Sequence, residues 1–178
     1  VVGIDTDAAD DTTTVMDDGV NVLDTSSSEN GQFVVGSDGS DDISTGSGSD
    51  LVFGGDGDDS IDAGGGNDLM IGGSGNDTFE GGEGDDAAFG GAGDDLFIFG
   101  AGDGSDFFSG GDGWSDTVQL DATAGDFGAP GGWDVQVDGD MAVTQTENTL
   151  EFESEASGTI TLSDGSELTF EGVDKIEW

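Results

Sequence analysis

Aspartate recurs every nine residues through the middle of this chain, at a spacing that could hold metal ions. Between Gly36 and Ile98 the sequence divides without a gap into seven nonapeptides, and the sixth place of each is an aspartate. These aspartates are Asp41, Asp50, Asp59, Asp68, Asp77, Asp86 and Asp95. Glycines crowd the places before each aspartate, and glycine lets a turn point several backbone carbonyls at one centre. Carboxylate and carbonyl oxygens together suit a hard cation, and calcium is the first candidate.

The elements that must position these aspartates follow from the same period, which indicates one small unit stacked on itself. Two places after each aspartate stands a non-polar residue: Ile43, Val52, Ile61, Met70, Phe79, Ala88 and Phe97. We interpret these as the inward side chains of short strands. Two nonapeptides then make one coil, and successive coils stack at a strand spacing of about 4.8 Å. The sequence predicts an all-β fold, a parallel β-roll of two sheets.

This geometry stacks turns that are two repeats apart on the same edge of the roll. One edge carries Asp41, Asp59, Asp77 and Asp95, and the other carries Asp50, Asp68, Asp86 and, as an extension, Asp106. Cations between stacked turns would take ligands from both, which gives roughly six ions. The alternative is that the aspartates merely cap turns, but stacked carboxylates without cations would repel each other at close range.

The predicted calcium site therefore consists of the stacked aspartates and the glycines of their turns. Two lengthened units, at 100–106 and 110–118, add Asp106 and Asp116 and are interpreted as turns adapted to end the array. The predicted glycines are Gly36, Gly39, Gly46, Gly48, Gly54, Gly55, Gly57, Gly64, Gly66, Gly72, Gly73, Gly75, Gly81, Gly82, Gly84, Gly90, Gly91, Gly93, Gly100 and Gly102.

The cleanest copy, Gly54-Gly55-Asp56-Gly57-Asp58-Asp59-Ser60-Ile61-Asp62, resembles the repeats of the RTX, or hemolysin-type, calcium-binding proteins. The resemblance covers residues 36–118, with Ser37, Thr45 and Ala63 departing from the glycine pattern. The segment from Gly158 to Ile176 is similar to segments that follow such repeats in large secreted bacterial proteins. The resemblance implies a two-sheet β-roll, calcium-triggered folding and export by a bacterial type I system without a cleaved N-terminal signal. The start of the chain shows no signal peptide, and we expect a secreted protein.

Three regions are expected along the chain. Residues 1–35 form an N-terminal extension with a cap strand at 33–35, and residues 36–118 form the roll. Residues 119–178 form a small antiparallel region of hairpins. One hairpin is predicted to join 133–137 to 141–143 across Asp138-Gly139-Asp140, and a second to join 160–162 to 168–170 across Asp164-Gly165.

Composition excludes several functions. The chain of 178 residues has 42 acidic residues against one basic residue, Lys175, and a formal net charge of −41. Such a balance often means disorder, but a disordered tail needs no fixed nine-residue register. No basic patch exists for nucleic acid, and no apolar run is long enough to insert into a membrane. Without His, Cys or Tyr, the usual nucleophile–base pairs cannot be built, so we expect no enzyme.

The outward side chains differ between the two predicted sheets. Alternate repeats carry polar pairs such as Asp42/Ser44, whereas the others carry apolar residues, which are Leu51, Phe53, Leu69, Ile71, Ala87 and Phe89. A free domain rarely exposes such a patch. Either the C-terminal hairpins or residues 1–35 cover it, or copies of the chain associate through it as a homo-oligomer or polymer. The tryptophans Trp114, Trp133 and Trp178 could stack on a sugar, but packing in small β cores is the more usual role.

Two functions are compatible with these features. The first is a secreted calcium-binding structural protein that folds on calcium and self-assembles as a matrix, surface-layer or filament subunit. The second is the C-terminal folding and secretion module of a larger enzyme, toxin or adhesin.

Overall fold

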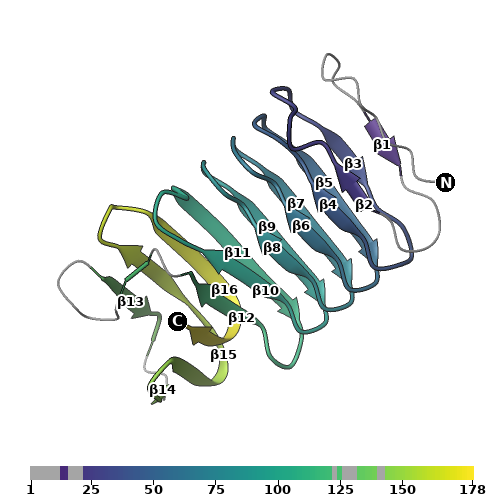
Figure 1. Ribbon diagram of the computed structural model, residues 1–178. Helices are drawn as coiled ribbons and strands as arrows, with labels where there is room; N and C mark the ends of the chain where they lie inside the picture. Colours follow the sequence, from purple (N-terminus) through teal and green to yellow (C-terminus); the bar gives the residue numbers. More distant parts are fainter. Residues whose placement is uncertain (1–12, 16–21, 122–123, 126–131, 140–142) are drawn as a thin grey trace.

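The computed structural model describes residues 13–15, 22–121, 124–125, 132–139 and 143–178. This part of the chain consists of sixteen strands joined by turns, and the strands form one continuous sheet folded into a roll (Figure 1). The all-β parallel roll predicted from the nine-residue period is confirmed. In the described residues no helix is long and apolar enough to cross a membrane.

Two parallel sheets form the walls of the roll. The first sheet contains β1 (Thr13–Val15), β3 (Phe33–Val35), β5 (Leu51–Asp56), β7 (Leu69–Ser74), β9 (Ala87–Ala92) and β11 (Ser105–Asp112). The second contains β2 (Val22–Asp24), β4 (Asp42–Ser44), β6 (Ser60–Asp62), β8 (Thr78–Glu80), β10 (Leu96–Phe99) and β12 (Thr117–Leu120). Partners in the regular part are 18 residues apart, as in Val52↔Met70 and Ile43↔Ile61. One coil is therefore two nonapeptides, as the period predicts.

The core is the single file of inward side chains from each sheet, because alternate residues of a strand face opposite sides. All seven predicted inward residues are buried, and Phe108 of β11 extends their file. Its ring stacks on Phe97 at a centroid distance of 5.4 Å and also meets Phe79 at 6.2 Å. In the regular coils one apolar side chain per strand fills the narrow interior, which explains why so few apolar residues support this part of the fold, whereas β10 and β12 add Phe99 and Leu120.

Parallel stacking begins before the first complete nonapeptide. β2 pairs with β4 and places the buried Leu23 in register with Ile43, and β3 pairs with β5. β1 pairs in turn with β3. A coil needs only an inward apolar residue and a turn, so segments without the glycine pattern can still join the stack.

The C-terminal region contains β13 (Trp133–Val137), β14 (Val143–Gln145), β15 (Thr149–Leu162) and β16 (Glu167–Glu177). The predicted hairpin across Asp164-Gly165 is confirmed, with Ile160 opposite Leu168. The predicted pairing of 133–137 with 141–143 is wrong for the described residues, since β13 and β14 each pair with β15 instead. The 14-residue β15 is long enough to take β14 along its first half and β13 along its second.

The last strand closes one end of the roll. β16 pairs in parallel with β11 through its first half and with β12 through its second, so it joins the two sheets. The C-terminal strands gather at this end in Figure 1, away from the middle of the walls. Trp133 is buried there and meets Trp178 edge to face at 5.2 Å, as expected for a small β core.

Candidate metal centre

The predicted aspartates form two continuous ladders along the edges of the roll. In each ladder the backbone N–H of one aspartate donates a hydrogen bond to Oδ1 of the aspartate one coil later, at 2.7 to 3.0 Å. One ladder contains Asp41, Asp59, Asp77, Asp95 and Asp116, and the other contains Asp50, Asp68, Asp86 and Asp106. The structure therefore places all nine predicted aspartates where stacked turns meet, and it adds Asp116 to the first edge.

The second carboxylate oxygen of these aspartates, Oδ2, indicates whether the ladders could bind a cation. Seven ladder aspartates have a buried Oδ2 with no hydrogen-bond partner among the described residues: Asp59, Asp68, Asp77, Asp86, Asp95, Asp106 and Asp116. Burying a charge without a partner is strongly unfavourable, and buried charges in proteins are normally paired or bind metal. Aspartates that only capped turns would not leave this oxygen buried and unused.

In most of these turns a glycine lies against the orphaned oxygen for a steric reason. A Cβ added to Gly72, the first residue of its turn, would lie 2.1 Å from Asp77 Oδ2. The first glycines of the neighbouring turns, Gly54, Gly81 and Gly90, lie against their own aspartates in the same way. Side chains at these places would fill the space next to the carboxylate, so the glycines keep room for a ligand.

The first aspartate of each ladder, Asp41 or Asp50, differs from the later ones because its Oδ2 accepts a hydrogen bond. Asp41 Oδ2 accepts hydrogen bonds from the N–H of Ser37 at 2.8 Å and from its hydroxyl at 3.0 Å. Asp50 Oδ2 accepts a longer bond from Gly46 N–H at 3.4 Å, and its Oδ1 accepts one from Gln32 N–H at 2.6 Å. Ser37 stands where a later turn has glycine, so this departure from the repeat gives the oxygen an internal partner.

The lengthened turn at 100–106 departs from the regular geometry. Gly100 N–H donates to Asp103 Oδ2, and Gly102 N–H donates to Ser166 Oγ at 3.1 Å. A Cβ at Gly102 would meet nothing within 4 Å, unlike the stacked turn glycines. The predicted Gly100 and Gly102 therefore lie in a looser turn that contacts the β15–β16 connection, although Asp106 itself belongs to the ladder.

A second, outer ladder uses the fifth place of the repeats. Asn76 N–H donates to Asp58 Oδ1 at 2.8 Å, and Asp94 N–H donates to Asn76 Oδ1 at 2.8 Å. The other edge has the same arrangement, with Asp85 N–H donating to Asn67 Oδ1 at 3.3 Å. These exposed residues were not predicted as part of the site. The signal was visible, since every fifth place from Ser40 to Asp94 is Ser, Asp or Asn.

Burial changes the acidity of the ladder. Desolvation raises the pKa of Asp59, Asp77, Asp86 and Asp116 to about 6, and neighbouring ladder carboxylates contribute to the increase for Asp59. The same cause raises the pKa of Asp68 and Asp95 to about 7 and that of Asp106 to about 8. Both effects oppose the charged form, so a cation is the natural counterpart of these groups.

These residues fit calcium. The buried orphaned oxygens supply charged ligands, and the glycine-rich turns supply backbone carbonyls, which together match the all-oxygen set of that ion. Among the described residues no three acidic side chains converge on one point. Backbone oxygens must therefore complete each site, which explains the need for several glycines per aspartate.

We expect a characteristic pH dependence without calcium. A carboxyl whose pKa is higher in the folded chain than the unfolded value of about 3.9 takes up a proton on folding. The ion-free fold is thus most stable near pH 4 and loses stability as the pH rises towards 8. Circular dichroism in EDTA is expected to show more β-structure at pH 4.5 than at pH 8. With calcium the dependence reverses, since protons compete for the ligands. A spectrum in EDTA that is independent of pH would contradict the buried ladder.

Comparison with known protein families agrees with this geometry. Residues 35–70 and 71–104 match the model of the RTX calcium-binding nonapeptide repeat, in four copies. The matched segments span the turns of both ladders from Asp41 to Asp95. A search of curated proteins finds no match to the chain. RTX repeats bind calcium, so the matched segment is a calcium-binding repeat region.

Proposed function

We propose that this protein, which carries RTX calcium-binding nonapeptide repeats, is a secreted structural protein that folds on calcium and then self-assembles. The observation that carries the proposal is the set of seven buried carboxylate oxygens without a partner. Without cations these buried charges destabilise the folded state, and the net charge of −41 adds repulsion within the chain. Where calcium is scarce, as in a cytosol, the chain stays open for export; outside, binding energy becomes folding energy.

Self-assembly is proposed from the outer side of the first sheet. Two ranks of outward side chains run along it in register, Phe33, Leu51, Leu69, Ala87 and Phe107, and Val35, Phe53, Ile71 and Phe89. Leu69 and Phe89 are 36% and 40% exposed. The C-terminal hairpins pack at the end of the roll and do not cover these two residues. A second copy of the chain would bury this face, and calcium would first remove the charge that keeps copies apart.

A catalytic role is not part of the proposal. The sequence has no His or Cys, and the acids with raised pKa values are mostly ladder members that calcium would occupy. The alternative, a folding and secretion module of a larger enzyme, toxin or adhesin, uses the same roll. Mass spectrometry of the natural secreted product separates the two, because the alternative requires a much longer mature chain.

Substitution of the apolar ranks tests assembly. The double variant Phe53→Thr/Ile71→Thr should fold with calcium but lose polymers in electron microscopy and analytical ultracentrifugation, because it removes two large side chains from the proposed interface. The matched control is Leu96→Thr/Ile98→Thr, an outward apolar pair of β10 in the second sheet, which should still polymerise. A monomeric parent protein at high calcium would contradict the proposal. General unfolding of the first variant alone would instead indicate an intramolecular cover.

A further inference from the structure

The first aspartate ladder does not end with the repeats. β12 and β16 pair in parallel with Thr117 opposite Lys175, so the preceding residues, Asp116 and Asp174, occupy equivalent places. Asp116 N–H donates to Asp174 Oδ2 at 3.0 Å, within the range of the regular rungs. A residue of the C-terminal strand, 58 positions later, thus takes the place of the next ladder aspartate.

The turn before Asp174 also imitates a repeat. A Cβ on Gly90 would lie 2.5 Å from the carbonyl oxygen of Gly110, and one on Gly110 would lie 2.4 Å from that of Gly172. Gly172 therefore continues the column of stacked first glycines, with Asp174 two places later instead of five. The spacing is not that of a nonapeptide, but the glycine and the carboxylate reach the same positions.

Asp116, whose N–H donates to Asp174, also has a carboxylate oxygen that could bind a cation. Asp116 is fully buried, and its Oδ2 has no partner among the described residues. Both carboxylate oxygens of Asp116 lie 2.9 Å from where a Cβ would stand on Gly113, which lines an open pocket of about 490 Å³. The orphaned oxygen thus lies in the last turn, against Gly110 and Gly113, and Gly113 borders the pocket between this turn and the C-terminal strands.

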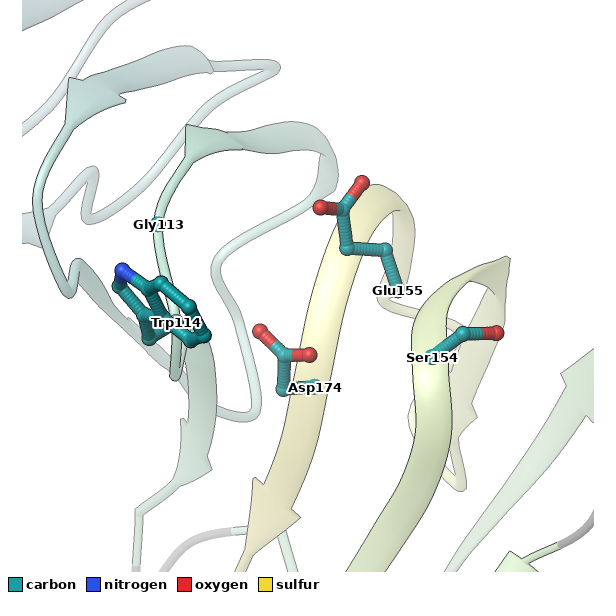
Figure 2. A pocket seen from close by; sticks show the side chains of 5 residues that line it. All are labelled: Gly113, Trp114, Ser154, Glu155 and Asp174. Atoms are coloured by element: carbon teal, nitrogen blue, oxygen red, sulfur yellow. The ribbon is translucent and has the colours of Figure 1, made fainter.

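The pocket contains two further carboxylates, from Asp174 and Glu155. Figure 2 shows the Asp174 carboxylate projecting toward the Trp114 indole, with the Glu155 carboxylate on the neighbouring strand. Glu155 reaches this place because β15 is irregular: Glu151 pairs with Lys175 and Ala156 with Val173, so β15 has extra residues between them. Such bulges re-aim side chains, and this one adds an acid beside the ladder.

The opposite edge provides an internal comparison. There β11 pairs with β16 so that Asp106 stands opposite Leu168, which has no oxygen to offer from its side chain. No carboxylate of β16 therefore extends the ladder beyond Asp106, although Asp164 of the β15–β16 connection lies close enough to contribute to the raised pKa of Asp103.

We propose that a further divalent cation site, for calcium, lies between the turn 110–116 and the C-terminal strands, held by Asp116 and Asp174 with Glu155 at its rim. Carbonyl oxygens of the glycine-rich turn complete the shell. The ion joins β16 to the roll, so that calcium also fixes the C-terminal region in place. The site is distinct from those between nonapeptides, because Asp174 lies outside the repeats.

Terbium, which replaces calcium and luminesces when a nearby tryptophan is excited, provides the test. Trp114 is 94% exposed and lines the pocket, whereas Trp133 and Trp178 pack against each other elsewhere. Asp174→Asn should bind one ion fewer by native mass spectrometry and lose most of the sensitised emission. Glu171→Gln removes the same charge from an exposed place on the same strand and should change neither.

A second variant keeps every proposed ligand. Trp114→Phe should retain the full ion count and lose most of the sensitised emission. Equal ion counts for Asp174→Asn and Glu171→Gln, or unchanged emission in Trp114→Phe, would overturn the proposal. Neither result would affect calcium binding by the regular ladders, which the remaining ion count reports separately.

Discussion

Chelation of calcium at pH 7.5 is expected to convert the β-rich protein into an unfolded chain, and millimolar calcium is expected to restore it. The reason is the density of like charge. Seven buried carboxylate oxygens have no partner of their own among the described residues, and the whole chain has a single basic residue to offset 42 acidic ones. Circular dichroism with EDTA followed by calcium measures the change, which should involve most of the β signal.

Sodium chloride provides the control for simple screening. At 0.5 M salt the screening length falls to about 4 Å, so general repulsion between exposed carboxylates weakens greatly. Salt supplies no ion that ligates like calcium, however, and the buried oxygens stay unpaired. We expect little folding in salt alone. Folding in salt without calcium, or an unchanged folded spectrum in EDTA, would show that the ladders need no bound ion.

Gly66→Ala is expected to weaken the roll strongly, although it adds only one methyl group. Gly66 has a φ of +126°, and its added Cβ would lie 2.2 Å from the carbonyl oxygen of Gly48 in the coil before it. A backbone carbonyl cannot move away from the added methyl group as easily as the end of a flexible side chain could. Strain in this glycine-only region alone costs about 1–3 kcal/mol, and the clash adds to it. The calcium midpoint of folding, followed by circular dichroism, should shift to a much higher concentration.

The neighbouring glycine is a matched control. Gly65 lies in the same turn, but its added Cβ would have no contact closer than 3.7 Å, and its φ is outside the left-handed region. A compatible Gly→Ala change stabilises by about 0.4–1 kcal/mol through the unfolded chain. Gly65→Ala should therefore leave the calcium midpoint nearly unchanged or lower it. Equal losses for the two variants would mean that glycine content, rather than stacking geometry, governs the turn.

The repeat itself made most of the roll predictable. A coil contains two nonapeptides, so the period alone determines which residues point inward and which aspartates share an edge. The ladders from Asp41 to Asp95 and from Asp50 to Asp86 follow from this rule, as do the buried files that include Met70 and Phe79. Local spacing is sufficient here because each unit contacts only its neighbours in the stack.

The C-terminal region was less predictable for the same reason. The turn at Asp164-Gly165 is a local signal, and the hairpin across it is present. The partner of 133–137 is not local: Val137 pairs with Gly158, beyond a nearer apolar segment that the sequence favoured. Hairpin signals report turn chemistry, whereas the choice among several possible partner strands depends on how the whole end of the roll packs.

The repeating unit, its calcium chemistry and the contrast between an apolar and a polar outer face could be predicted from residue types, since these features depend on a short period. What closes the roll, which carboxylate oxygens lack a partner and where the ladder ends became visible only in the folded chain. The meeting of Asp116 with Asp174 joins residues 58 apart, with no period linking them. Such a contact arises from the way β16 docks between β11 and β12, and no local pattern carries that information.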